Sequence, residues 1–230
     1  MATLYVIGLP IGNSEDITYR ALKTLGSINV IYAEDTRNTA HLFSTLSKTH
    51  NIKIEPHIQS YYREKEFSKI AEILNQLEKG TDIGLVSDAG MPTVSDPGSL
   101  LIHSVQKAGH SVVVIPGVSA VTTAFAYCGF TAKSVVFLGF LPRKERSILG
   151  ACAAAVDSQL DKPLAVIFFE SARNIRSTLA ILSKNFGAYR VCLSRNMTKK
   201  DEVIRFVDLS TLDLSRIDED GEYTGILMVK

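Results

Sequence analysis

The sequence has almost no net charge. Its 25 Lys and Arg residues are balanced by 24 Asp and Glu residues, which gives a formal charge of +1 at pH 7. A protein dedicated to binding nucleic acid usually carries a clear basic excess. The composition therefore argues against nucleic-acid binding through overall charge. Any contact with RNA would need local basic patches, a partner protomer, or an already assembled ribonucleoprotein.

Cysteines and metal-ligand patterns are also scarce. The three cysteines, Cys128, Cys152 and Cys192, lie in apolar or Ala-rich surroundings, and none belongs to a Cys-x-x-Cys motif. We interpret them as small buried apolar residues in a reducing compartment. The five histidines are scattered without the spacing of zinc-binding motifs, so the sequence predicts no metal site.

The sequence lacks a long uninterrupted apolar run. The longest, residues 112–130, is broken by Pro116, Gly117 and several hydroxyl side chains, which makes it unsuited to crossing a bilayer. The N-terminus passes directly into the apolar segment 4–7, without the basic and long apolar regions of a signal peptide. We expect a cytoplasmic protein with no membrane contact.

The first half of the chain alternates predicted strands and helices. Hydrophobic runs predict strands at residues 4–8, 30–33, 83–87 and 111–115, and we expect the last of these to be buried. Between them we expect a helix capped by Asn13 and ended by Gly26, and a helix from about Glu64 to Gly80. Another helix should begin with Asp96 as N-cap and Pro97 in its first turn. This alternation predicts a mainly parallel sheet with helices on both faces.

The second half has a different pattern. Strands are predicted at residues 135–140, 164–169, 190–194, 202–206 and 224–229, and clear helices only at 146–159 and 174–185. The two strands on either side of residues 199–200 suggest a hairpin, so we expect a mixed sheet. We place the domain boundary near Gly117, with an N-terminal α/β lobe at 1–116 and a C-terminal α+β lobe at 117–230. The predicted fold is α/β, with two lobes and a ligand cleft between them.

Four unusual loops follow predicted strands of the first half. Ligands of open α/β sheets bind beyond the carboxyl ends of the strands, which is where these loops lie. The segment 8–13 is a Gly-x-x-x-Gly turn that lacks the lysine of a P-loop and the spacing of a dinucleotide fingerprint. Taken alone, it is therefore weak evidence for a binding site. The segment 87–98 combines two glycines, two prolines and small hydroxyl residues. Such a composition fixes the backbone path while allowing close approach to a ligand.

The other two loops carry possible chemistry. Glu34, Asp35 and Arg37 directly follow a strand. They could form a helix cap with a surface ion pair, or they could position a hydroxyl group and accept its proton. The segment 116–120 begins a helix with Pro-Gly-Val-Ser-Ala, whose exposed N–H groups and small side chains suit an anionic group such as a carboxylate.

These loops, in this order, resemble the tetrapyrrole-methylase superfamily, and within it the ribosomal RNA 2′-O-methyltransferases. The resemblance continues into the second half with Gly139-Phe-Leu-Pro-Arg-Lys144 and Phe168-Phe-Glu-Ser171. The similar stretches are residues 4–6, 10–13, 15–18, 20–22, 33–37, 86–98, 116–120, 139–144 and 168–171.

The resemblance implies a homodimer that uses S-adenosyl-L-methionine, held in the cleft between the lobes. It implies that the acceptor is the small ribosomal subunit or its 16S rRNA, methylated on the ribose 2′-hydroxyl of a cytidine. Carried onto this sequence, the cofactor-binding residues are Pro10, Asp88, Ala89, Gly90, Met91, Thr93, Val94, Pro116, Gly117, Ser119, Ala120, Phe168, Thr224 and Gly225.

Catalytic and RNA-binding residues are expected on three segments. Our hypothesis is that Glu34 or Asp35 acts as the base or orients it, while Arg37 holds the carboxylates or a phosphate. Basic residues that could contact RNA phosphates, or could simply form a solvated surface, are Arg143, Lys144, Arg146, Lys199 and Lys200.

Two alternatives remain at this stage. The same fold supports C-methylation of tetrapyrrole precursors of the uroporphyrinogen or precorrin type, although segments 34–37 and 139–144 argue against it. The chain could also be a non-catalytic relative that binds the cofactor. Departures from the family pattern at residues 172–174 and 196–197 are the features that suggest this.

Overall fold

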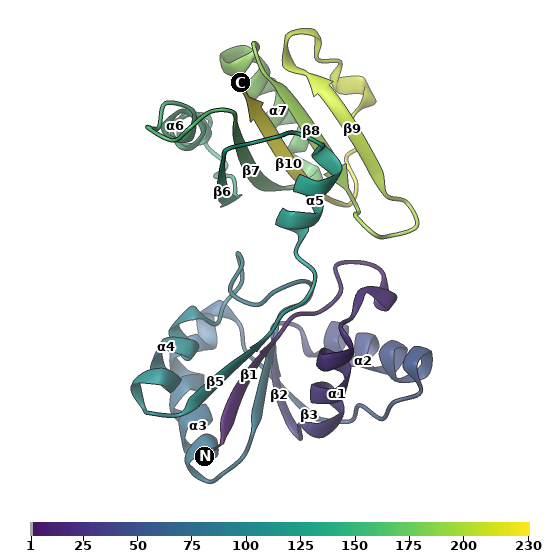
Figure 1. Cartoon of the computed structure of the whole chain (residues 1–230), viewed down its shortest axis with the longest axis vertical. Coiled ribbons are helices and arrows are strands. Elements are labelled where there is room, and N and C mark those ends of the chain that lie inside the picture. Colours follow the sequence, from purple (N-terminus) through teal and green to yellow (C-terminus); the bar gives the residue numbers. More distant parts are fainter. Residues whose placement is uncertain (1) are drawn as a thin grey trace. The chain divides into compact units, whose positions relative to one another are not determined.

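The chain forms two compact α/β units. The computed structural model describes residues 2–230, apart from the side chain of Lys65. One unit ends at Ser119, and the other runs from Ala120 to Lys230 (Figure 1). Each unit is built on a five-stranded sheet, the first wholly parallel and the second mixed. The predicted α/β class and the predicted character of each sheet are confirmed.

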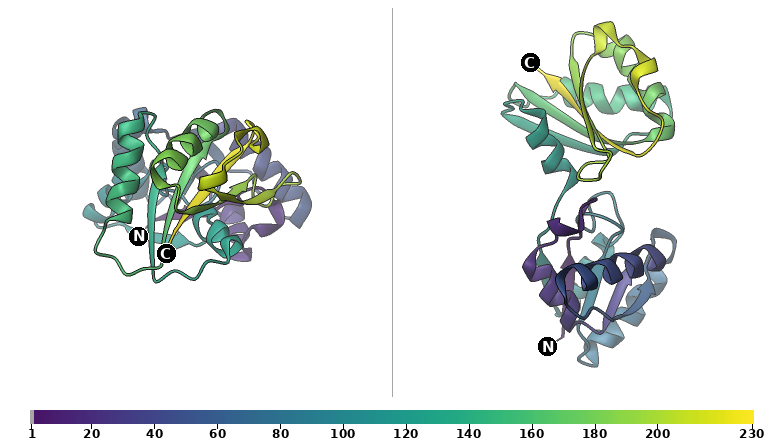
Figure 2. Two further views of the ribbon diagram at one scale, coloured as in Figure 1. Left: turned by 90° about the horizontal axis from the view of Figure 1, so that it is seen from above. Right: turned by 90° about the vertical axis from the view of Figure 1, so that its right-hand side faces the viewer.

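The first unit is a parallel sheet covered on both faces. Its strand order is β3-β2-β4-β1-β5. The strands are β1 (Thr3–Ile7), β2 (Val30–Ala33), β3 (His57–Ser60), β4 (Ile83–Val86) and β5 (Ser111–Ile115). The helices are α1 (Tyr19–Ser27), α2 (Thr36–His50), α3 (Glu66–Glu78) and α4 (Ser99–Lys107). Helices α1 and α2 lie on one face of the sheet, and α3 and α4 lie on the other. Each pair of helices packs over a separate hydrophobic core (Figures 1 and 2).

The start of the first helix differs from the prediction. Asn13 caps only a short 3-10 turn, η1 (Ser14–Asp16). Its side-chain oxygen accepts a hydrogen bond from the Glu15 N–H at 3.0 Å. Ile17 and Thr18 are then extended, and the Thr18 hydroxyl caps α1 by accepting the N–H of Ala21 at 3.1 Å. The segment is therefore two elements with two caps, because Thr18 competes successfully for the N-cap position.

Two further expectations for this unit were wrong. Asp96 does not cap a helix, because α4 starts only after Gly98, whose φ of +128° lies outside the range that other residues readily adopt. Strand β5 is an edge strand, so Val113 and Val114 are exposed instead of buried. Strand β3 was not predicted, and helix α2 was suggested only by the possible helix cap at residues 34–37, not by the pattern of its own residues. A further 3-10 turn, η2 (Arg63–Lys65), precedes α3.

The second unit has the strand order β6-β7-β10-β8-β9. Only β6 and β7 are parallel, and β8 and β9 form the expected hairpin. The strands are β6 (Ser134–Phe140), β7 (Leu164–Ser171), β8 (Arg190–Arg195), β9 (Val203–Asp208) and β10 (Glu222–Val229). The other elements are α5 (Ala120–Cys128), α6 (Glu145–Val156), α7 (Ala172–Phe186), η3 (Leu209–Thr211) and η4 (Leu214–Arg216).

Helices α6 and α7 pack over one face of this sheet, where the main core of the unit lies. Helix α5, the helix expected to follow the segment 116–120, contacts β8 and β10. Within residues 2–230, no helix is long and apolar enough to cross a membrane.

The core of the second unit depends on a close contact between Phe168 and Gly225. The Phe168 side chain is fully buried on β7 and lies over Gly225, its partner on β10. A Cβ added to Gly225 would lie 2.2 Å from Phe168 Cζ. The ring is enclosed, so it has no room to move away.

We expect Gly225→Ala to lower the free energy of unfolding by roughly 1–3 kcal/mol, because the new methyl group overpacks the core. Gly150→Ala is the matched control, since no atom lies within 4 Å of its added Cβ in α6. That change should leave stability equal or raise it by about 0.5–1 kcal/mol. Urea denaturation followed by circular dichroism measures both. Equal stability of Gly225→Ala and the unmodified protein would contradict this view of the core.

Candidate functional site

The loops after β1, β4 and β5 meet at the carboxyl edge of the parallel sheet. Leu9 and Gly90 form a two-way backbone bridge, with N···O distances of 2.8 and 3.1 Å. The N–H of Gly8 donates to Ile115 O at 3.0 Å. Three of the four loops singled out in the sequence are thus joined by main-chain hydrogen bonds.

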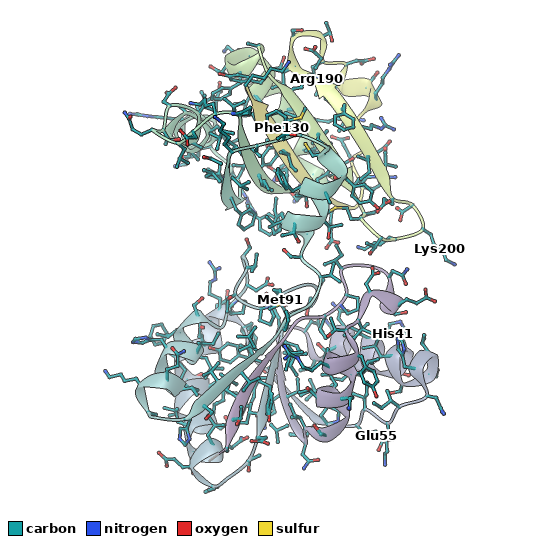
Figure 3. The ribbon with its side chains drawn as sticks, in the orientation of Figure 1. His41, Glu55, Met91, Phe130, Arg190 and Lys200 are labelled. Carbon is teal, nitrogen blue, oxygen red and sulfur yellow. The ribbon has the colours of Figure 1, made fainter. Side chains whose placement is uncertain are left out.

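Gly8 and Gly117 are in direct main-chain contact. A Cβ on Gly8 would lie 2.7 Å from Gly117 N, and a Cβ on Gly117 would lie 2.9 Å from the Gly8 Cα. The sulfur of Met91 fills the adjoining space and accepts the N–H of Gly117 at 3.3 Å (Figure 3). Only glycine at both positions allows the loops after β1 and β5 to approach this closely.

The loop between β4 and α4 has an unusual backbone. Thr93 and Ser95 both have positive φ, at 74° and 73°, and Gly90 has a φ of 71°. For residues other than glycine this conformation costs on the order of 1–3 kcal/mol, and it is concentrated at binding and catalytic sites. The strain identifies this loop as one shaped for a purpose other than connection.

Asp35 is the N-cap of α2. Its carboxylate accepts the N–H groups of Arg37 at 2.8 Å and Asn38 at 3.3 Å, and it pairs with the Arg37 guanidinium at 3.2 Å. The hydrogen bonds from Arg37 lower the pKa of Asp35. Of the two interpretations of this segment, the helix cap therefore applies to Asp35. Its ionised carboxylate accepts the N–H groups at the start of α2.

Asp88 ties the loop after β2 to the loop after β4. Its carboxylate accepts the Asp35 backbone N–H at 3.0 Å and the Asn38 side-chain amide at 3.4 Å. The fourth loop is thereby joined to the others. All four converge on one edge of the first unit.

Glu34, Asp88 and Asp96 form a group of interacting carboxylates at this edge. Burial, followed by the negative charge of Asp88, raises the pKa of Glu34. Burial, followed by the charge of Glu34, raises the pKa of Asp96 to about 6. Arg63 opposes both shifts. Like charges held close together cannot all ionise freely, so Glu34 and Asp96 keep their protons to a higher pH than ordinary carboxyl groups do.

The candidates from the second unit are placed differently. Phe168, Thr224 and Gly225 are buried within their own sheet, with Phe168 and Thr224 exposing 0% and 3% of their surface. This burial argues against a direct ligand contact by Phe168. The accessible ring at this position belongs to the neighbouring Phe169, which points to the opposite face of the sheet.

The basic candidates lie in two separate groups. Arg143, Lys144 and Arg146 are exposed between β6 and the first turn of α6. Lys199 and Lys200 lie in the β8–β9 hairpin loop (Figure 3). Lys199 is ion-paired with Glu222 at 2.7 Å. The first group follows the edge strand β6, and the second precedes β9, the edge strand on the other side of the sheet.

Among the described residues, no three His, Cys, Asp or Glu side chains are grouped so as to hold a metal ion. The thiols are buried, and burial raises the pKa of Cys152 to about 11 and that of Cys192 to about 12. Such thiols are poor nucleophiles because little thiolate forms near neutral pH.

A family model described as Tetrapyrrole (Corrin/Porphyrin) Methylases matches residues 3–213. The chain belongs to the tetrapyrrole methylase family. The resemblance inferred from the loop residues is thereby confirmed, and the site described above lies almost wholly within the matched region.

Several relatives of this tetrapyrrole methylase share the name ribosomal RNA small subunit methyltransferase I. The protein of Thermotoga maritima is 40% identical over 86% of this chain and 85% of its own length. That of Micromonospora olivasterospora is 40% identical over 87% of this chain and 61% of its own length. The protein of Bacillus subtilis is 36% identical over 89% of this chain and 67% of its own length. The chain thus spans less than two thirds of one of these relatives.

Solved structures of more distant proteins share the fold. Diphthine synthase matches with a TM-score of 0.74 and 13% identity, over 100% of this chain and 90% of that one. Uroporphyrin-III-C-methyltransferase from Thermus thermophilus matches with a TM-score of 0.66 and 15% identity, over 98% and 94%. At such low identities the similarity concerns the fold alone.

Sequence reasoning missed two features of this tetrapyrrole methylase. Asp96 was interpreted as a helix cap, although it belongs to the carboxylate group. The only signal for that role was its position in a loop at the end of a strand. The sequence also could not show which ring of the Phe168-Phe169 pair is buried, because only the register of β7 against β10 separates the two.

The raised pKa of Asp96 predicts a pH-dependent effect of Asp96→Asn. The native carboxyl holds its proton to about pH 6, against 3.8 for the ordinary group. Ionised Asp96 therefore costs stability, and this cost develops as the pH rises from about 4 to beyond 6. At pH 8 the free energy of unfolding of Asp96→Asn should exceed that of the unmodified protein by on the order of 1 kcal/mol, after allowance for partial solvent screening. The gain should fall to about half at pH 5 and should largely disappear below about pH 4, where the carboxyl is protonated in both the folded and the unfolded chain. Urea titrations of both proteins over this pH range measure the stability difference. If that difference does not depend on pH, the raised pKa of Asp96 is excluded.

Proposed function

We propose that this chain is an S-adenosyl-L-methionine-dependent methyltransferase that methylates the ribose 2′-hydroxyl of a cytidine in small-subunit ribosomal RNA. The observation that supports this most strongly is the 40% identity to the Thermotoga maritima protein over 86% of the chain and 85% of that relative. The family match to residues 3–213 includes both the loop site and the segment 139–144.

The residues at the carboxyl edge suit a cofactor held mainly by main chain. S-adenosyl-L-methionine, when bound, supplies a methyl group on an electrophilic sulfonium. Gly8, Gly90 and Gly117 keep this edge free of side chains, and the added Cβ of Gly90 would meet nothing closer than 3.4 Å. The left-handed Thr93 and Ser95 orient the adjoining peptide groups. Asp88 contributes a carboxylate on the same loop.

Glu34 is the better candidate for the base. Asp35 is committed to the α2 cap and to Arg37, both of which favour its ionised form and weaken it as a proton acceptor. The Glu34 side chain reaches solvent at the edge, while partial desolvation of its carboxyl group and the charge of Asp88 raise its pKa. A carboxylate whose pKa approaches the working pH accepts a hydroxyl proton more effectively. We assign Glu34 to proton acceptance and Asp35 to positioning.

The exposed cations of the second unit would contact RNA phosphates. Arg143, Lys144 and Arg146 are better placed for this than Lys199, because Lys199 already pairs with Glu222. A homodimer and a cytoplasmic location stay predictions. The tetrapyrrole alternative gains no support from the Thermus thermophilus structure, since 15% identity reflects a shared fold only.

Methyl transfer to purified small subunits tests the proposed function. Labelled S-adenosyl-L-methionine is incubated with this protein and small ribosomal subunits from cells lacking the matching activity, with naked rRNA in parallel. We expect label in a ribose-methylated cytidine, with more in subunits than in naked rRNA, because the protein itself has little net charge to attract RNA. Cofactor binding without label in either substrate would favour the non-catalytic alternative. Label in a uroporphyrinogen-type substrate alone would favour the tetrapyrrole alternative.

Glu34→Gln tests the assigned base. We expect kcat to fall roughly 100-fold or more, which is typical for loss of a general base, with cofactor affinity retained. In the unmodified protein, kcat should fall as the pH drops below the raised pKa of Glu34, and this limb should be absent from Glu34→Gln. Asp35→Asn is the matched control, because asparagine also caps helices and should retain turnover within a few-fold. Full turnover in both variants would exclude this loop as the source of the base.

A further inference from the structure

A bulge in β6 gathers three aromatic rings on one face of the second sheet. Phe137 pairs with Ile167 and Phe140 pairs with Phe169, so three steps along β6 match two steps along β7. Alternate strand residues face opposite sides, and a regular strand would therefore separate Phe137 from Phe140. The extra residue lies at Leu138–Gly139, where Gly139 has a φ of +68°.

The three rings form an ordered and accessible cluster. The Phe169 ring centroid lies 4.9 Å from that of Phe137 and 5.5 Å from that of Phe140, with interplanar angles of 67° and 66°. Such edge-to-face contacts fix ring orientation. Phe140 is nevertheless 61% exposed. A large apolar ring is thus held rigidly at the surface.

The chain leaves this cluster directly into a basic segment. The N–H of Leu141 donates to Phe169 O at 3.2 Å, and the Leu141 side chain is buried. This anchors the residues that follow. Arg143, Lys144 and Arg146 are exposed, and within the described part of the chain they form no ion pair.

We propose that Phe140, supported by Phe137 and Phe169, is a stacking surface for an unpaired base of the RNA substrate, with Arg143 and Lys144 beside the adjoining phosphates. This inference rests on the proposed function and names residues that recognise its substrate. An exposed ring next to unpaired cations is the combination that binds single-stranded RNA, whereas bases within a duplex are already stacked.

The charge pattern favours RNA over a second copy of this chain as the occupant. A two-fold contact through this surface would bring the same patch of both copies together. The unpaired cations of one copy would then face those of the other, which is unfavourable. A polyanion neutralises them.

Phe140→Leu and Phe140→Trp test the proposal in the full chain. The first keeps an apolar side chain without a ring, and the second keeps a ring. Affinity is measured by fluorescence anisotropy with a labelled single-stranded oligocytidine, and with an abasic oligonucleotide of equal length. We expect Phe140→Leu to weaken oligocytidine binding roughly 5- to 150-fold, the range known for loss of one base–aromatic stack. Phe140→Trp should bind at least as well as the unmodified protein, and binding of the abasic strand should be the same for all three.

Phe206→Leu is the matched control. Phe206 is a 48% exposed ring on β9, with the Arg190 guanidinium 5.6 Å from its centroid. It should leave RNA affinity unchanged. The stacking surface is excluded if Phe140→Leu and Phe206→Leu have the same affinity for oligocytidine. It is also excluded if Phe140→Leu weakens binding of the abasic strand as much as binding of oligocytidine.

Two other outcomes would also overturn the proposal. Reduced affinity for S-adenosyl-L-methionine with unchanged RNA affinity, measured by calorimetry, would assign the rings to the cofactor. A smaller particle mass of Phe140→Leu in light scattering would assign them to contact between copies. Failure of the proposed function itself is distinguishable, because the unmodified protein would then neither bind oligocytidine nor methylate small subunits.

Discussion

The contact between the main chains of Gly8 and Gly117 supports the rest of the candidate site. It joins the loops after two adjacent parallel strands, and the Met91 sulfur and the Leu9–Gly90 bridge bring the loop after β4 to the same place. In a parallel sheet all carboxyl ends lie at one edge. Direct contact between two backbones adds a stricter condition, because any side chain at either position would force the loops apart.

Within this frame, the acidic residues have separate tasks. Asp35 is held ionised by the start of α2 and by Arg37, and Asp88 links that helix start to the loop after β4. Glu34 and Asp96 are left in a partly buried, negatively charged setting that raises both pKa values. The neighbours therefore divide similar carboxylates into a structural cap and a proton-holding group. Residue type alone does not reveal that division.

The sequence predicts those features that depend on hydrophobic periodicity. Buried strands such as β4 and β7 stand out as apolar runs, and the two-unit α/β organisation follows from their order. Hydrophobic periodicity did not predict helix α2, because its sequence is rich in Thr, Ser, Asn and His and buries only Thr39, Phe43 and Leu46. The choice between Phe168 and Phe169 depends on strand parity. The Phe140 cluster depends on a bulge, which reverses that parity through the backbone of one glycine.

The charges of this chain are balanced overall but unpaired locally, and this affects how quickly a polyanion is captured. At physiological salt the field of the 143–146 cations extends only about 8 Å into solvent, and the rest of the surface adds no net attraction. Long-range steering can raise association rates to 10⁸–10⁹ M⁻¹s⁻¹, whereas weakly charged proteins associate at about 10⁵–10⁶ M⁻¹s⁻¹. Encounters with RNA should therefore belong to the slower class, so that residence on the target, more than the speed of finding it, determines which RNA is modified.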